Sequence, residues 1–146
     1  SNDIKGVRDS AGAILEQYPR SIYAPLAALV SAKVHVQAGD IKTARAQLQW
    51  VVEHSRSAEI RSIATLRLAS VLVDDGAVKD AEKLMEQKPS EGFEGLFAVM
   101  RGDLKHAQSN ISEARTAYRA ALDGPTKLDP AMQNLVQLKL DALGDS

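Results

Sequence analysis

The sequence lacks cysteine altogether, has only 4% aromatic residues and carries no excess of one charge. Without cysteine it can form no disulfide, thiol nucleophile or zinc–thiolate site, and its redox compartment stays undetermined. A net charge of −1 creates no field that would attract nucleic acid or an anionic membrane. No apolar run reaches the ~18 residues that a membrane-spanning helix needs. Motifs for phosphate cradling, serine hydrolysis or zinc proteolysis are also missing.

The length of 146 residues suits one domain, and we expect a single domain over residues 1–146. A chain of this size buries roughly 70% of its unfolded surface, so it can form a substantial core. The chain begins with Ser1 and Asn2 rather than with Met. This start is typical of an expression remnant on a fragment of a longer protein.

A ladder of small and apolar residues occurs three times. Successive members lie 7, 2, 3 and 4 residues apart in each copy, and the copies are offset by 37 and then 33 residues. A helical repeat of about 34 residues is typical of tetratricopeptide arrays. The copies are Ala32, Gly39, Ile41, Ala44, Leu48 and Val51; Ala69, Gly76, Val78, Ala81 and Met85; and Gly102, Ser109, Ile111, Ala114, Tyr118 and Ala121.

Turn signals around the ladder predict eight helices and no strand. Short connections make consecutive helices antiparallel, which gives three helical hairpins. The expected fold is all-α: a tetratricopeptide-like helical-hairpin solenoid with about three repeats, an N-terminal half-repeat helix and a C-terminal capping helix. The predicted helices cover roughly 3–17, then the pairs 22–38 with 41–54, 58–75 with 78–87, and 91–107 with 111–123, and finally 130–143.

Particular residues are expected to begin and end these helices. Ser21 is the expected N-cap of helix 22–38, so Pro25 is the fourth helical residue. Proline is tolerated there because the first four N–H groups of a helix have no intrahelical partner. Pro89 and the left-handed stop at Gly39 end their helices. The other expected caps are Asp40, Ser90, Asn110 in a capping box with Glu113, and Asp129, which precedes Pro130 at a first helical position.

The small ladder residues are expected where the two helices of a hairpin touch, because short side chains allow the backbones to approach closely. Larger ladder residues then fill the space beyond the contact. The small residues are Ala32, Ala69 and Gly102 on the first helices and Ala44, Ala81 and Ala114 on the second, and the larger ones are Leu48, Met85 and Tyr118.

The surface expected to bind partners is the concave face, which the first helix of each pair lines in tetratricopeptide arrays. Leu29 and Leu66 stand where a clamp for a peptide carboxylate would need polar groups, so that binding mode is excluded. The apolar groove either binds an apolar peptide or is filled by the chain's own last helix. Helical spacing assigns to this face Leu29, Lys33, Val36, Leu66, Ser70, Val73, Val99, Asp103 and His106.

The last helix carries an apolar stripe that matches that groove. It comprises Met132, Leu135 and Leu138, at spacings of three, with Leu143 further along. We expect helix 130–143 to pack against the last hairpin and to close the groove in part, leaving the remainder to partner peptides.

Few residues suggest chemistry. Asp103 and His106, three positions apart, form the best pair for a metal or hydrolytic site, but a solvated helix face explains them equally well. The carboxylates Asp74 and Asp75 precede a helix-ending glycine, which favours turn chemistry. Trp50, the sole tryptophan, is expected to pack between hairpins rather than to contact a ligand. We therefore expect no catalytic, metal or cofactor site.

Several motifs support a family resemblance over roughly residues 15–143. The most specific runs from Tyr18 to Leu29, with the sequence Tyr-Pro-Arg-Ser-Ile-Tyr-Ala-Pro-Leu-Ala-Ala-Leu. It is followed by Gly39-Asp40, Ala46-Gln47-Leu48, Leu66-Arg67-Leu68-Ala69, Arg101-Gly102-Asp103, and Ala114-Arg115 with Tyr118 and Ala121. Together these segments resemble the periplasmic region of the YfgM family.

The resemblance implies a bacterial inner-membrane protein with one N-terminal membrane helix and a periplasmic repeat domain, so the anchor would lie upstream of this fragment. It also implies partnership with the SecYEG translocon, the periplasmic chaperone PpiD and exported polypeptides, and it carries over no catalytic residue. The expected function is a non-enzymatic interaction domain that links the translocon to periplasmic chaperones. A regulatory scaffold that sequesters a signalling protein is the alternative, because it needs the same kind of groove.

Overall fold

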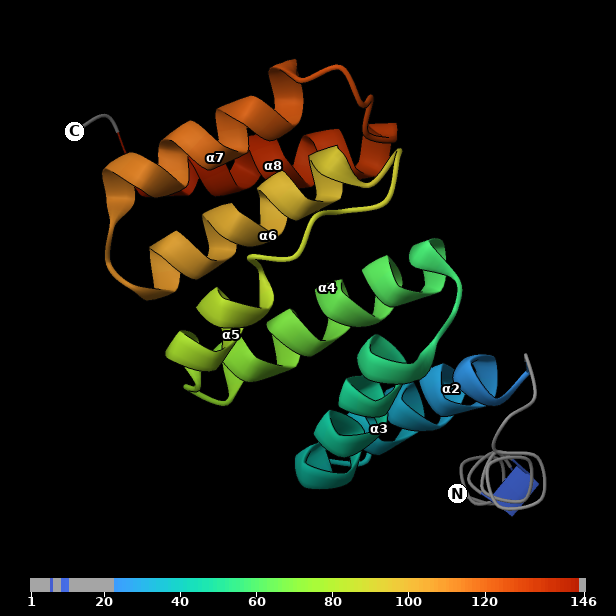
Figure 1. Cartoon of the computed structure of the whole chain (residues 1–146). Coiled ribbons are helices and arrows are strands. Elements are labelled where there is room, and N and C mark those ends of the chain that lie inside the picture. Colours follow the sequence, from blue (N-terminus) through green and yellow to red (C-terminus); the bar gives the residue numbers. More distant parts are fainter. Residues whose placement is uncertain (1–5, 7–8, 11–22, 145–146) are drawn as a thin grey trace. The chain divides into compact units, whose positions relative to one another are not determined.

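The computed structural model describes residues 6, 9–10 and 23–144, and these contain seven α-helices and no strand (Figure 1). The all-α class predicted from the sequence is therefore confirmed for this part of the chain. Contacts group the chain into two compact units, Ser1–Val71 and Leu72–Ser146, each of which is described by itself. The expected helix 3–17 lies almost wholly outside the described residues, and the single domain over 1–146 stays a prediction.

The first unit is built around the hairpin of α2 (Ala24–Gln37) and α3 (Ile41–His54). The two helices pack on each other, and the ladder residues Ala32, Ala44 and Leu48 are all buried, as the ladder predicts for residues at such a contact. The chain then enters α4 (Ala58–Asp74), whose first turn is closed by a hydrogen bond of 3.2 Å from the Ile60 N–H to the Ser57 hydroxyl.

The start of α2 differs from the prediction. The N-cap is Tyr23, so Pro25 is the second helical residue and not the fourth. Proline suits this position because its fixed φ fits the first turn and its missing N–H has no intrahelical partner to lose. The cap predicted at Ser21 falls outside the described residues.

The second unit contains α5 (Val78–Leu84), α6 (Glu94–Ala107), α7 (Ile111–Asp123) and α8 (Pro130–Leu143). In it α5 packs on α6, α6 on α7, and α7 on α8, the last three running side by side in Figure 1. The core of these three helices includes the fully buried Tyr118 and Val136.

The same backbone turn closes three of the predicted helices. Its central residue is left-handed in each case: Gly39 has φ 82°, Gly76 φ 80° and Ser109 φ 60°. The following N–H then donates to the carbonyl five residues earlier, as in a Schellman motif. This repeated geometry explains why the ladder has one spacing. The three hydrogen bonds, each 2.8 Å long, run from Asp40 N to His35 O, from Ala77 N to Leu72 O, and from Asn110 N to Lys105 O.

Two helix ends lie three residues inside their predicted positions. Helix α5 stops at Leu84, and the chain tightens because Glu86 and Gln87 donate to carbonyls only three residues back. Helix α6 begins at Glu94, because Gly92 is left-handed with φ 93° and cannot continue a right-handed helix. Phe93 therefore occupies the N-cap position predicted for Ser90.

Three predicted side-chain caps are confirmed. Asp40 accepts a hydrogen bond from Thr43 N at 3.3 Å, Asn110 from Glu113 N at 3.2 Å, and Asp129 from Met132 N at 2.8 Å. The capping box at Asn110 is present only in half. The turn already satisfies the Asn110 N–H, and the Glu113 carboxylate pairs instead with Lys105 at 3.1 Å.

The last helix packs on α7 as predicted, but its contact stripe centres on Val136 rather than on Leu135 and Leu138. Val136 is fully buried, and Met132, Leu140 and Leu143 are partly buried around it. Leu135 and Leu138, which were expected to face the hairpin, are 43% and 65% exposed. The two stripes lie on neighbouring faces of α8, and only the one with four-residue spacing meets α7.

A glycine replaces alanine in the third hairpin because its partner is larger. A Cβ atom on Gly102 would overlap the ring of Tyr118. In the first hairpin the corresponding residues are Ala32 and Leu48, both buried without such an overlap. The pairing of glycine with tyrosine thus keeps the same helix contact with a larger side chain.

Replacing Ser109 by glycine is expected to stabilise the protein. The left-handed conformation costs a residue with a Cβ about 1 kcal/mol, and glycine removes this cost. Part of that stabilisation is offset, because glycine has more conformational entropy in the unfolded chain. We expect Ser109→Gly to raise the free energy of unfolding by about 0.5 kcal/mol in urea melts. The matched reverse variant, Gly39→Ser, should lower it, and a loss of stability in Ser109→Gly would contradict this account.

Gly102→Ala is expected to destabilise the second unit by about 1–3 kcal/mol, because the new methyl group overpacks the Tyr118 ring. Tyr118→Leu removes the obstacle and recreates the alanine–leucine pairing of the first hairpin. The double variant should therefore lose less stability than the two single variants together. Urea melts of all four proteins measure this coupling, and strict additivity would show that the two positions do not touch.

Candidate functional site

The residues predicted for the concave face have very different exposures. Leu29 and Val99 are buried, at 6% and 7%, and Val99 belongs to the core of the second unit. A partner could reach these two only if their neighbours moved. The role of the set in binding stays a prediction. Leu66, Val73 and Asp103 are half-buried, whereas Lys33, Val36, Ser70 and His106 are exposed.

Among the described residues of the first unit, the most exposed large apolar side chains lie on another stripe of α2, which was not predicted. Tyr23, Leu26 and Val30 are 64%, 46% and 52% exposed. Their spacing of three and four residues places them on one face, and we call them the α2 ridge. Lys33 lies on the same face, since seven residues, or two helical turns, separate it from Leu26. Because α2 is apolar on nearly every side, its sequence pattern could not identify the exposed face.

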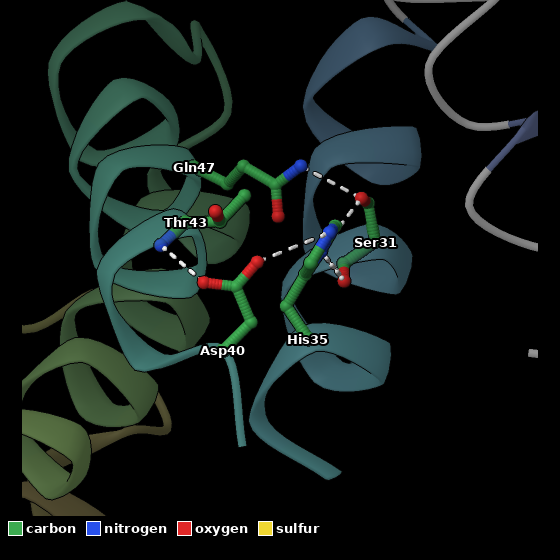
Figure 2. A network of polar contacts seen from close by, with 5 residues as sticks. All are labelled: Ser31, His35, Asp40, Thr43 and Gln47. Atoms are coloured by element: carbon green, nitrogen blue, oxygen red, sulfur yellow. Dashed lines mark hydrogen bonds and ion pairs between the residues drawn. The ribbon is translucent and has the colours of Figure 1, made fainter. Parts of the chain in front are cut away.

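Polar side chains tie the two helices of the first hairpin together (Figure 2). The Gln47 amide on α3 donates to the buried Ser31 hydroxyl on α2 at 2.7 Å. His35, one turn further along α2, donates from Nδ1 to the Ser31 carbonyl at 2.8 Å, and its Nε2 lies 4.0 Å from the Asp40 carboxylate. Asp40 also caps α3. The network therefore fixes the turn between α2 and α3 relative to both helices.

Trp50 and His54 form a stacked pair on α3. Their ring centroids are 5.1 Å apart with an angle of 18° between the planes, and His54 Nδ1 donates to the Trp50 carbonyl at 2.9 Å. Trp50 is half-buried and His54 is exposed. The tryptophan thus has a local partner within its own helix.

Asp103 joins three helices rather than forming a pair with His106. Its Oδ1 atom accepts a hydrogen bond of 2.5 Å from the Tyr118 hydroxyl on α7 and one of 2.6 Å from Lys139 on α8. No hydrogen bond or ion pair links Asp103 to the exposed His106 within the described residues. Across that same part of the chain, no group of three His, Cys, Asp or Glu residues is placed to hold a metal ion.

The environment of Tyr118 favours its neutral form. Burial, followed by the hydrogen bond and the negative charge of Asp103, raises the pKa of Tyr118 far above its usual value. Removing the phenolic proton would place a second negative charge beside the Asp103 carboxylate. The network of Asp103, Tyr118 and Lys139 is therefore intact only while the phenol stays protonated.

The raised pKa gives a prediction about alkaline stability. The unfolded chain loses the Tyr118 proton near pH 10 whereas the folded protein keeps it, so the stability from this group is fully present below about pH 10 and is lost as pH rises above it. We expect the free energy of unfolding to fall less between pH 8 and pH 11 in Tyr118→Phe than in the unmodified chain. Equal losses in urea melts at the two pH values would contradict the prediction.

Comparison with known proteins identifies the fold family and several relatives. The family model of the tetratricopeptide repeat-like domain matches residues 1–145. Over 128 residues the chain is 30% identical to the ancillary SecYEG translocon subunit of Neisseria gonorrhoeae, covering 88% of this chain and 61% of that protein. The protein of the same name from Escherichia coli is 27% identical over 124 residues, covering 85% and 59%. That from Haemophilus influenzae is 25% identical over 146 residues, covering 97% and 70%.

The chain thus spans about three fifths of the length of the first two relatives. No solved structure shows a significant match. Among the described helices, none combines the length and the apolar character needed to cross a bilayer. The repeated turns and the helix contacts agree with the matched family model. The chain therefore belongs to the tetratricopeptide repeat-like domain family, and its resemblance to the YfgM family of ancillary SecYEG translocon subunits is confirmed.

Proposed function

We propose that this chain is a non-enzymatic interaction domain that holds exported polypeptides beside the SecYEG translocon and passes them to periplasmic chaperones, PpiD among them. The observation that carries the proposal is the α2 ridge, an exposed apolar surface on a helix of a scaffold-type fold. The names of the relatives support the link to the translocon. We place the domain on the periplasmic side of a bacterial inner membrane, anchored by a single upstream helix.

The α2 ridge has the properties that binding of unfolded chains requires. Apolar attraction is non-directional, so one surface can accept many sequences. Soluble proteins seldom leave neighbouring large apolar side chains in water without a use for them. The hydrogen bond from Gln47 to Ser31 ties α2 to α3 through a face of α2 other than the ridge, so the ridge can be occupied without rearranging the hairpin.

The proposal predicts which positions crosslink in cells. A photoreactive amino acid at Leu26 or Val30 of the full-length protein should label translocon subunits and an arrested export intermediate. Glu59, an exposed polar position in the same unit, is the matched control and should give little label. Label found only on cytosolic proteins, or equal label from Glu59, would refute the proposal.

Two variants separate binding from folding. Leu26→Gln and Val30→Gln change exposed side chains, so each should leave the free energy of unfolding within about 0.5 kcal/mol of the original. Combined, they should reduce crosslinking from Tyr23 to the arrested intermediate several-fold. Partner recovery that ignores export altogether would support the regulatory scaffold instead.

A further inference from the structure

The second unit contains a groove between α7 and α8 that no function yet explains. Its volume is about 510 Å³. The partly buried Leu122 and Leu140 form its apolar base, since both pack against the core of the unit. Charged side chains of both signs surround this base. The groove therefore offers a short apolar surface bordered by ionic groups.

Only some of these charges are already engaged. Arg115 donates to the Gly144 carbonyl at 2.7 Å, and Asp141 accepts from the Gln137 amide at 3.0 Å. Arg119 and Asp123, also in the lining, make no hydrogen bond or ion pair with any described residue. They are four residues apart on α7, but with the cation first, which is the less favourable order for pairing along a helix. Two opposite charges thus remain available along one wall.

The separation of these two charges matches an extended polypeptide. Four residues of helix rise by about 6 Å. In an extended chain, side chains that point to the same side are two residues, or about 6.6 Å, apart. An acidic and a basic side chain two positions apart can therefore meet Arg119 and Asp123 together. The residue between them points the other way, toward α8, where Leu140 provides apolar contact.

We propose that the groove between α7 and α8 binds an extended polypeptide segment with the pattern acidic–aliphatic–basic. The acidic side chain pairs with Arg119, the basic one with Asp123, and the aliphatic one packs on Leu140. This inference rests on the proposed function in taking a polypeptide as the ligand. It adds a second binding surface with its own sequence preference, distinct from the α2 ridge.

The test is a titration of the isotope-labelled chain, followed by NMR, with the blocked peptide Ser-Gly-Asp-Leu-Lys-Gly-Ser. We expect saturable shifts of the Arg119 side chain and of amides in α7 and α8. A control peptide with Asn and Gln in place of Asp and Lys should bind roughly fivefold more weakly, because two exposed ion pairs are lost. Lack of saturable shifts in α7 and α8, or equal binding of the two peptides, would overturn the proposal.

Charge-reversal variants check the assignment to individual residues. Arg119→Glu should abolish the preference for the charged peptide, whereas Lys127→Glu, at an exposed position in the same unit and outside the lining, should keep it. Combining Arg119→Glu with Asp123→Lys should restore the preference, with the peptide running in the opposite direction. Circular dichroism of each variant verifies folding. An unchanged preference in Arg119→Glu would overturn the proposal.

The result of the peptide titration is independent of the result of the crosslinking experiment on α2. If the peptide fails to bind while Leu26 and Val30 still label export intermediates, only the inference about the groove is wrong. If the peptide binds in the groove but those positions label nothing in the translocon pathway, the groove stands and the proposed function fails.

Discussion

The hairpins α2–α3 and α6–α7 each depend on a close approach of two helix backbones, and only a very small side chain fits at the point of contact. The alanines on the second helices, Ala44, Ala81 and Ala114, are all fully buried. The approach also fixes the turn that joins the helices, because a longer or differently shaped turn would move the contact out of register. Packing and turn geometry are therefore two aspects of one constraint in these two hairpins, and the same turn also follows α4.

That constraint explains which parts of the fold the sequence predicts well. Helices α3, α7 and α8 begin and end where expected: each start has an Asp or Asn cap, and α7 and α8 are followed by glycine. The start of α6 was predicted from Ser90, but the left-handed Gly92 ends any helical path from there. A cap residue is a weaker signal than a glycine that follows it. The Ser90 side chain only favours a helix start, whereas the left-handed backbone at Gly92 prevents a helix from continuing through that position.

The candidate surfaces were harder to predict, because exposure depends on contacts between distant residues. Helix α2 is apolar on most faces, so its sequence could not show that Leu26 is exposed and Leu29 buried. In α8, two apolar stripes compete for the same neighbour, and packing selects the one around Val136. The role of Asp103 was likewise hidden, since its partner Lys139 lies 36 residues away in sequence. Local sequence patterns identify helices, whereas the buried face of a helix and the pairing of distant side chains are determined only by packing in the folded chain.

The stacked pair on α3 has a consequence for how the protein can be observed. The chain's single tryptophan, Trp50, lies in the first unit and against His54, so its fluorescence reports on the unfolding of that unit. Far-ultraviolet dichroism, in contrast, senses the helices of both units. Comparing the two signals during denaturation therefore reveals directly whether the units unfold together or in sequence. The arrangement of one aromatic residue thus makes the cooperativity of the repeat array measurable without any label.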